Sequence, residues 1–130
     1  LLTRAKTLDK AFYFDTYALV EIAKSNQNYT DYREGIKILT NKFNLMELAY
    51  FLFRISKEDK IELVFKDYLK YNIEPSTNAL IGAAKLKFLQ KKKKLSYIDC
   101  LGYMIAKENK VKFLTGDEKF RDMPNVEFVK

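Results

Sequence analysis

The chain has 130 residues, 48% of them hydrophobic, and its 24 Lys and Arg against 17 Asp and Glu give a net charge of +7. This length suits one domain with a buried core, and the charge favours a polyanionic partner such as nucleic acid or an acidic membrane surface. With no His and one Cys, Cys100, the sequence excludes Ser-His and Cys-His catalysis, intrachain disulfides and Cys-rich zinc sites. No apolar run approaches the ~20 residues of a membrane span, and we expect a cytoplasmic protein. Chemistry at neutral pH is left to carboxylates, Lys, Tyr or a bound metal ion.

The chain is expected to form a single domain. Residues 1–10 are kept apart, because the sequence begins with Leu and this segment is either an addition or a trimmed native segment. Residues 11–130 contain no repeat, and their only low-complexity stretch is a short lysine run. The four Gly and two Pro of the chain are too few for long flexible linkers.

Strands and helices are predicted to alternate along the chain. Short apolar runs rich in aromatic or β-branched residues predict strands, and longer runs with helical spacing predict helices. In chain order these are a strand at 11–14, a helix at 17–24, a strand at 36–40, helices at 44–55 and 57–71, a very short strand at 73–74, helices at 78–90 and 97–109, and strands at 111–114 and 126–129. Helix caps are expected at Ser56, at Ser76 or Thr77, and at Ser96. The alternation favours an α/β fold with helices on both faces of a parallel sheet, where ligands bind beyond the carboxyl ends of the strands.

Four acidic residues stand in unusual surroundings. Asp15 ends the first predicted strand and Asp117 lies three residues beyond Leu114, so both should emerge at the same edge of a parallel sheet. Glu47 and Asp99 are each the only charged residue in a long apolar stretch. A helix that is apolar on every face is expected to be buried, and a buried carboxylate has to be paired, protonated or bound to a metal.

Each acid also has a simpler structural interpretation. Asp15 could cap the helix that follows it, and Asp117 could cap the turn after it. Asp99 lies near a helix start, where negative charge is favourable, and Glu47 could pair with a lysine or with Arg54. All four interpretations would have to hold together for the chain to lack an acidic site.

A site built from carboxylates favours Mg2+ or Mn2+, which prefer oxygen ligands. Two such ions can activate a water and stabilise the leaving oxygen of a phosphodiester, one ion could do part of this, and the number of ions stays open. The excess of Lys and Arg would attract RNA that an acidic pocket alone would repel. The basic run is either an RNA contact or, more simply, a solvated loop; it consists of Lys91, Lys92, Lys93 and Lys94.

Four segments in this order and spacing resemble the PIN-domain ribonucleases, particularly the small VapC-type toxins of toxin–antitoxin modules. They are Phe14–Leu19 with Asp15, Thr40 with Asn44–Leu48 and Glu47, Leu95–Cys100 with Asp99, and Phe113–Phe120 with Thr115 and Asp117. The match spans residues 12–129. The family often has Ser at the position of Tyr17, a difference that bears on local packing more than on metal binding.

The resemblance implies a three-layer α/β/α sandwich with a mostly parallel central sheet. It implies that Asp15, Glu47, Asp99 and Asp117 bind Mg2+ or Mn2+, with Thr115 as a supporting hydroxyl among the catalytic residues. It also implies endonucleolytic RNA cleavage, a homodimer and inhibition by a cognate antitoxin protein. We therefore expect a metal-dependent endoribonuclease, either a toxin or an RNA-processing enzyme.

The residues alone leave the individual roles open. Asp15 and Asp99 are expected to bind metal directly, and Glu47 directly or through a water. Asp117 is expected to bind through a water or to orient the nucleophile, and the Thr115 hydroxyl to hold a ligand carboxylate.

Three other functions are weighed against this one. A non-catalytic PIN-like module that binds RNA or protein would not need all four acids. A phosphotransfer receiver domain would need acids grouped at the first strand, where only Asp15 is found, and a Lys after a late strand, where Thr115 and Asp117 stand. A structure-specific DNA nuclease usually has more acids and a longer chain.

Overall fold

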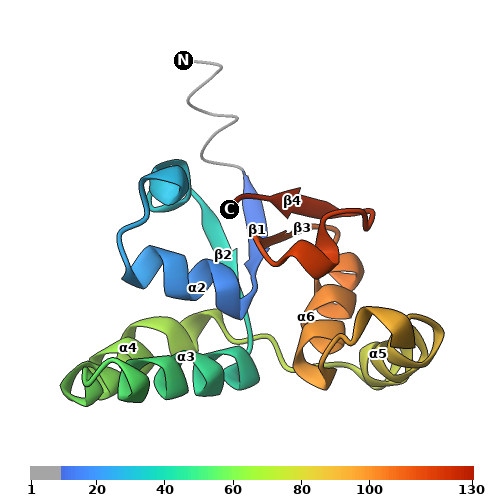
Figure 1. Cartoon of the computed structure of the whole chain (residues 1–130), viewed down its shortest axis with the longest axis horizontal. Helices are drawn as coiled ribbons and strands as arrows, with labels where there is room; N and C mark the ends of the chain where they lie inside the picture. The colour runs from blue at the N-terminus through green and yellow to red at the C-terminus, as the bar shows by residue number, and fades with distance from the viewer. Residues whose placement is uncertain (1–9) are drawn as a thin grey trace.

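A computed structural model describes residues 10–130, so the separate segment expected at residues 1–10 lies outside the described residues except for Lys10. Four strands form one sheet in the order β2-β1-β3-β4, and every neighbouring pair is parallel (Figure 1). The strands are β1 (Ala11–Phe14), β2 (Lys37–Leu39), β3 (Lys112–Thr115) and β4 (Val126–Phe128). The strand predicted at 73–74 is wrong, because Thr40 and Asn72 form only an isolated bridge there and Pro75 follows.

Helices cover both faces of the sheet, as the three-layer α/β/α prediction requires (Figure 1). On one side lie α2 (Thr16–Ala23), α3 (Lys42–Arg54) and α4 (Ile61–Tyr68), and on the other α5 (Thr77–Leu89) and α6 (Tyr97–Glu108). Side chains alternate along β1, so Phe12 and Phe14 pack into the first layer and Tyr13 into the second. Short 3-10 turns complete the chain at η1 (Gln27–Tyr32), η2 (Glu58–Lys60), η3 (Leu69–Tyr71), η4 (Lys91–Lys93) and η5 (Glu118–Phe120). Within residues 10–130, no helix has the length and apolar character needed to cross a membrane.

Helix caps explain where the predicted boundaries hold and where they fail. Ser76 and Ser96 cap α5 and α6 as predicted, each accepting a backbone N–H with its hydroxyl oxygen. Ser56 is not a cap: it adopts a φ of 57° in a turn, and the helix predicted at 57–71 is divided into η2, α4 and η3. Helix α3 begins earlier than predicted, because the Asn41 side chain accepts the N–H groups of Phe43 and Asn44.

The prediction that α3 is buried on every face is wrong. Met46, Tyr50 and Phe53 are 55%, 65% and 60% exposed, although Leu45, Leu48 and Leu52 on the other face are buried. The apolar composition of this helix therefore conceals a solvent-facing side, and Glu47 is half-buried at its border. Helix α6 agrees better with the prediction, since most residues from Cys100 to Ala106 are buried.

The strand order creates a natural position for a site. The chain passes from β1 to β2 on one side of β1, whereas β3 lies on its other side. In open parallel sheets, the crevice at such a reversal, beyond the carboxyl ends of the strands, is where ligands bind. Asp15 directly follows β1, and Asp117 lies two residues beyond the end of β3.

Candidate metal centre

Asp15 is the most deeply buried of the four acids. Its side chain is 3% exposed at the carboxyl end of β1, and its Oδ2 accepts a hydrogen bond from the Thr115 hydroxyl at 2.8 Å. Its Oδ1 is buried without a hydrogen-bond partner among the described residues. Asp15 occupies the N-cap position of α2 but makes no side-chain capping bond, so the capping interpretation is wrong.

The surroundings of Asp15 oppose its negative charge. Burial, followed by repulsion from Asp99, raises the pKa of Asp15 from its usual value of 3.8 to about 8, although the hydrogen bond from Thr115 partly offsets this. Glu47 adds a smaller repulsion. A cation beside Oδ1, which has no hydrogen-bond partner in the described part of the chain, would favour the ionised carboxylate.

Thr115 joins the ends of the two central strands. It is fully buried; its hydroxyl donates to Asp15 and accepts the backbone N–H of Asp117 at 3.1 Å. Asp117 caps η5, because its Oδ1 accepts the N–H of Lys119 at 3.0 Å. Its Oδ2 lies 3.9 Å from Nζ of Lys119. Asp117 therefore caps the turn after it, as predicted, and its backbone N–H lies against the Thr115 hydroxyl.

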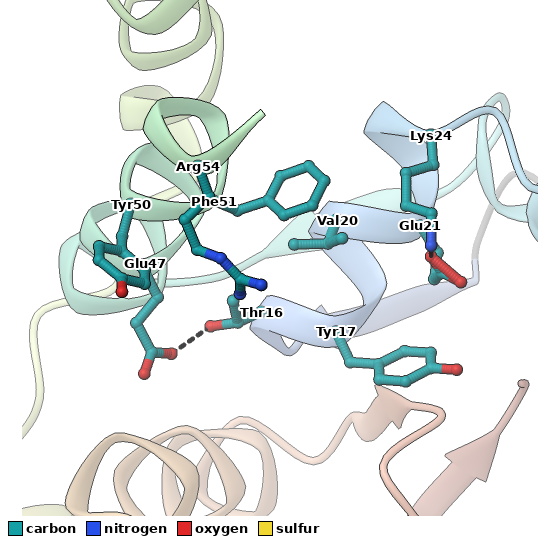
Figure 2. A pocket seen from close by; sticks show the side chains of 9 residues that line it. All are labelled: Thr16, Tyr17, Val20, Glu21, Lys24, Glu47, Tyr50, Phe51 and Arg54. Carbon is teal, nitrogen blue, oxygen red and sulfur yellow. Dashed lines mark hydrogen bonds and ion pairs between the residues drawn. The ribbon is translucent and has the colours of Figure 1, made fainter. Parts of the chain in front are cut away.

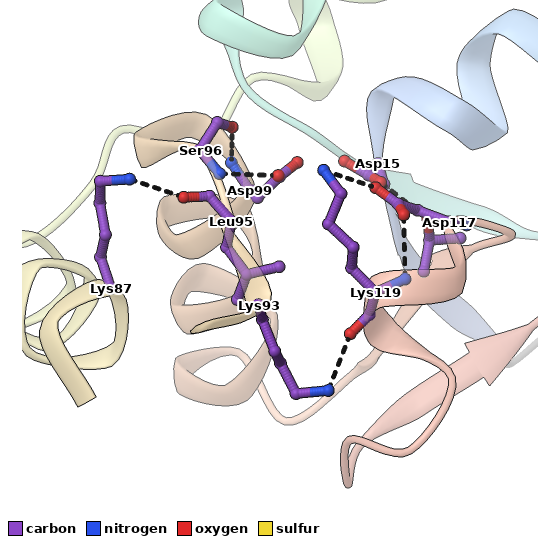
Figure 3. Close-up of polar contacts among 9 residues, drawn as sticks. Asp15, Lys87, Lys93, Leu95, Ser96, Asp99, Asp117 and Lys119 are labelled. Atoms are coloured by element: carbon purple, nitrogen blue, oxygen red, sulfur yellow. Dashed lines mark hydrogen bonds and ion pairs between the residues drawn. The ribbon is translucent and has the colours of Figure 1, made fainter. Parts of the chain in front are cut away.

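Asp99 has a structural role and still faces the other acids. Its Oδ2 accepts the N–H of Ser96 at 2.9 Å, and its own N–H donates to the Ser96 hydroxyl at 3.0 Å, forming a capping box at the start of α6. Its charge raises the pKa of both Asp15 and Glu47, which indicates that it lies near both. In the view of Figure 3, the amine of Lys119 lies between Asp99 on one side and Asp15 and Asp117 on the other.

Glu47 approaches the same region from α3. Its Oε1 accepts the hydroxyl proton of Thr16 at 2.5 Å (Figure 2). No ion pair joins Glu47 to Arg54 or to a lysine within residues 10–130, so the pairing foreseen for it is absent there. Burial raises the pKa of Glu47, and repulsion from Asp99 adds to the effect. Glu47 also lines a cavity of about 440 Å³ together with Tyr50 and Arg54 (Figure 2).

Two polar residues near Glu47 were not among the predicted site residues. The amide of Asn44 donates to the Thr16 hydroxyl at 3.0 Å, and its Oδ1 accepts the proton of the Tyr13 hydroxyl. The available signal was Asn44 itself, an amide three residues before Glu47 in an apolar stretch.

Tyr17 packs against a glycine. A Cβ added to Gly116 would overlap both the Tyr17 ring and the carbonyl oxygen of Val129. The missing side chain at position 116 therefore makes room for the large one at position 17.

The donor set fits a hydrated divalent cation. Each of the four acids uses one carboxylate oxygen in a hydrogen bond that positions it, and the second oxygen forms no hydrogen bond within the described part of the chain. No three acidic or cysteine side chains of residues 10–130 lie close enough together to form a ready-made metal cage. Mg2+ and Mn2+ do not need one, because such ions are commonly held by one or two carboxylates and several waters. The residues fit this kind of site, with the unpartnered Oδ1 of Asp15 as its centre.

The four lysines of the predicted basic run have different surroundings: two contact other residues and two are exposed. Nζ of Lys93 donates to the carbonyl oxygen of Lys119 at 3.2 Å, which ties η4 to η5 (Figure 3). Lys91 lies over the Phe88 ring at 4.9 Å. Lys92 and Lys94 are exposed, and these two have their amines available for a phosphate.

Comparisons with known proteins agree with the architecture. The model of the PIN domain family matches residues 12–126. A toxin–antitoxin complex from Klebsiella pneumoniae has a similar chain, with a TM-score of 0.68 and 17% identity over 88% of this chain and 94% of that one. VapBC2 from Rickettsia felis, bound to a DNA fragment from its promoter, has a TM-score of 0.69 and 20% identity over 92% of this chain and 99% of that one. PAE2754 from Pyrobaculum aerophilum has a TM-score of 0.66 and 14% identity over 92% of this chain and 90% of that one. None of the curated proteins compared with the chain matches it significantly. At these identities the structural neighbours establish the fold alone.

Proposed function

The chain belongs to the PIN domain family, and from this premise we propose that it is a metal-dependent endoribonuclease. PIN domains are generally nucleases. The observation that carries the proposal is the buried Asp15 carboxylate, whose Oδ1 has no hydrogen-bond partner within residues 10–130 and whose pKa is raised to about 8 by burial and by Asp99. A structural aspartate would be expected to have its oxygens satisfied by donors.

The cation would be Mg2+ or Mn2+, held directly by Asp15 and Asp99, and by Glu47 directly or through a water. When bound, it would supply charge stabilisation and an activated water for cleavage of a phosphodiester. Thr115 fixes the orientation of Asp15 by donating to Oδ2, which leaves Oδ1 for the ion. Asp117, held at the start of η5, would orient a water.

The substrate in this proposal is RNA. The net charge of +7 would attract a polyanion, and Lys92 and Lys94 offer exposed amines for phosphate contacts, with Lys91 and Lys93 nearby. The single cysteine and an RNA substrate suit a cytoplasmic location.

The proposal is tested by incubating the protein with end-labelled RNAs of mixed sequence in Mn2+ or in EDTA. We expect cleavage in Mn2+ only, and a loss of at least about 100-fold in Asp15→Asn and Asp99→Asn. Asp122→Asn, the same change at an exposed aspartate, serves as the control and should cleave normally. RNA binding without cleavage in the unmodified protein, unaffected by Asp15→Asn, would instead support the non-catalytic module. The observation that favours this alternative is that residues 10–130 contain no ready-made metal cage.

The proposal includes two protein partners. Two of the structural neighbours come from toxin–antitoxin complexes, which supports a cognate antitoxin that inhibits the enzyme. A homodimer is supported by apolar side chains left exposed on α3, α5 and α6, among them Met46, Leu80 and Tyr97. Light scattering of the purified chain should give twice the mass of 15.3 kDa; a monomer at all concentrations would contradict the dimer.

A further inference from the structure

A buried chain of hydrogen bonds ends at Glu47. The Tyr13 hydroxyl donates to Oδ1 of Asn44, Nδ2 of Asn44 donates to the Thr16 hydroxyl at 3.0 Å, and Thr16 donates to Oε1 of Glu47 at 2.5 Å. The four residues come from β1, α2 and α3, so the chain of bonds connects the sheet with two helices.

The order of donors in this chain is determined by its chemistry. An amide side chain has one end that accepts and one that donates, and a hydroxyl has a single proton. Because Oδ1 of Asn44 accepts from Tyr13, Nδ2 must face Thr16. Because Thr16 accepts from Nδ2, its only proton is directed to Glu47. The Tyr13 hydroxyl thus determines, two bonds away, which group receives the Thr16 proton.

Tyr13 and Asn44 are not explained by packing alone. Both are 0% exposed, and the Tyr13 ring stacks on Phe113 in the core, where Phe would fill nearly the same volume. The Tyr13 hydroxyl has the buried Oδ1 of Asn44 as its acceptor, so its proton has a defined direction. A buried polar pair that could be replaced by apolar residues specifies an orientation rather than adding stability.

We propose that Tyr13 and Asn44 are positioning residues, which lock the Thr16 hydroxyl as a donor to Oε1 of Glu47 and so leave Oε2 for the cation. The inference depends on the proposed function only in taking Glu47 as a metal ligand. Without the Tyr13 hydroxyl, the Asn44 amide is free to rotate by 180°. Its Oδ1 then takes the Thr16 proton, and Glu47 loses its only anchor among the described residues.

The test measures binding of Mn2+ alone to the full chain by titration calorimetry, with thermal unfolding as a check on folding. Thr16→Val should weaken Mn2+ binding about tenfold, the lower end of the range for residues that orient metal ligands. Tyr13→Phe acts through Asn44 and Thr16 and should weaken it less, by about threefold. Thr16→Ser keeps the hydroxyl and should restore most of the affinity. Tyr103→Phe is the matched control: Tyr103 is also buried, but its hydroxyl donates to the carbonyl of Pro124, away from the acids.

A second arm separates positioning from a general loss of structure. In a Glu47→Gln background, Tyr13→Phe should no longer change Mn2+ affinity, whereas a merely structural Tyr13 would weaken binding equally in both backgrounds. If Glu47→Gln weakens binding but Tyr13→Phe and Thr16→Val do not, this inference is overturned and the metal site stands. If Glu47→Gln binds Mn2+ as well as the unmodified chain does, Glu47 is not a ligand and the inference is overturned, whereas the site at Asp15 and Asp99 stands. If the unmodified chain does not bind Mn2+, both the site and the inference are overturned.

Discussion

Replacing Asp15 with Asn should stabilise the metal-free protein at neutral pH while removing its metal site. Asn has nearly the same shape and can still accept the hydrogen bond from Thr115. What it loses is the ability to ionise. The folded protein holds Asp15 protonated up to about pH 8, whereas the unfolded chain ionises it near its usual pKa of 3.8. Between these values unfolding releases a proton, so the stability contributed by Asp15 falls as the pH rises.

The size of the effect follows from this difference in pKa. Each pH unit above 3.8 lowers the free energy of unfolding by about 1.4 kcal/mol, or about 4 kcal/mol by pH 7. Against this, Asn would place a buried N–H where Oδ1 now has no partner, a loss of about 1–3 kcal/mol. We expect Asp15→Asn to be roughly 1–3 kcal/mol more stable at pH 7, and less stable by a similar amount at pH 4.

Urea denaturation of both proteins in EDTA, at several pH values from 4 to 8, measures this difference. It should change sign within that interval and grow by about 1.4 kcal/mol per pH unit. Asp122→Asn, at an exposed position, should remain close to the unmodified protein throughout. Added Mn2+ should stabilise the unmodified protein and not Asp15→Asn. A difference independent of pH, or a less stable variant at pH 7, would refute the argument that burial opposes the Asp15 charge.

Three further changes test other parts of the structure. Thr115→Val removes the donor to Asp15 and should weaken Mn2+ binding at pH 7 at least about tenfold by calorimetry, because the ionised carboxylate loses its hydrogen bond; unchanged affinity would mean that Thr115 only shapes the strand end. Gly116→Ala should lower the free energy of unfolding by about 1–3 kcal/mol in urea, since the new Cβ meets the Val129 backbone as well as Tyr17; adding Tyr17→Ser should recover only part of that loss. Lys92→Gln with Lys94→Gln should weaken RNA binding and reduce the slope of log affinity against log salt by about 1 per lysine that contacts phosphate; an unchanged slope would leave these lysines as simply solvated.

The positions of the four strands along the chain could be predicted because each strand is marked by a local sequence pattern. The strand at 11–14 has the predicted bounds, since an apolar aromatic run before an acid is a strong local pattern. The exposed side of α3 could not be predicted, because Met46, Tyr50 and Phe53 interrupt the polar periodicity that normally marks a solvent-facing side. The positive φ of Ser56 could not be predicted either, because a Ser before a helical pattern is ordinarily a cap.

The acids were recognised because a carboxylate in apolar surroundings is conspicuous in a sequence. How Glu47 is held could not be predicted, because it depends on side chains from elements distant in the chain: Thr16 and Glu47 are 31 positions apart, and Asn44 and Thr16 are 28 positions apart. The turn cap formed by Asp117 was foreseen because it is local, and the hydrogen bond from Thr115 to Asp15 is of the kind expected from the resemblance. Asp99 illustrates a further difficulty: the capping role and the proposed ligand role are compatible, since one carboxylate oxygen serves each.

The close approach of Tyr17 and Val129 to Gly116 constrains the two positions unequally. A Cβ at position 116 would overlap both the Val129 carbonyl oxygen and the Tyr17 ring, so a smaller residue at position 17 removes only one of the two obstacles. Position 17 can therefore become smaller while glycine is kept at 116, whereas a side chain at 116 also requires the backbone after β4 to move. The backbone contact makes glycine the more strongly constrained residue of this pair.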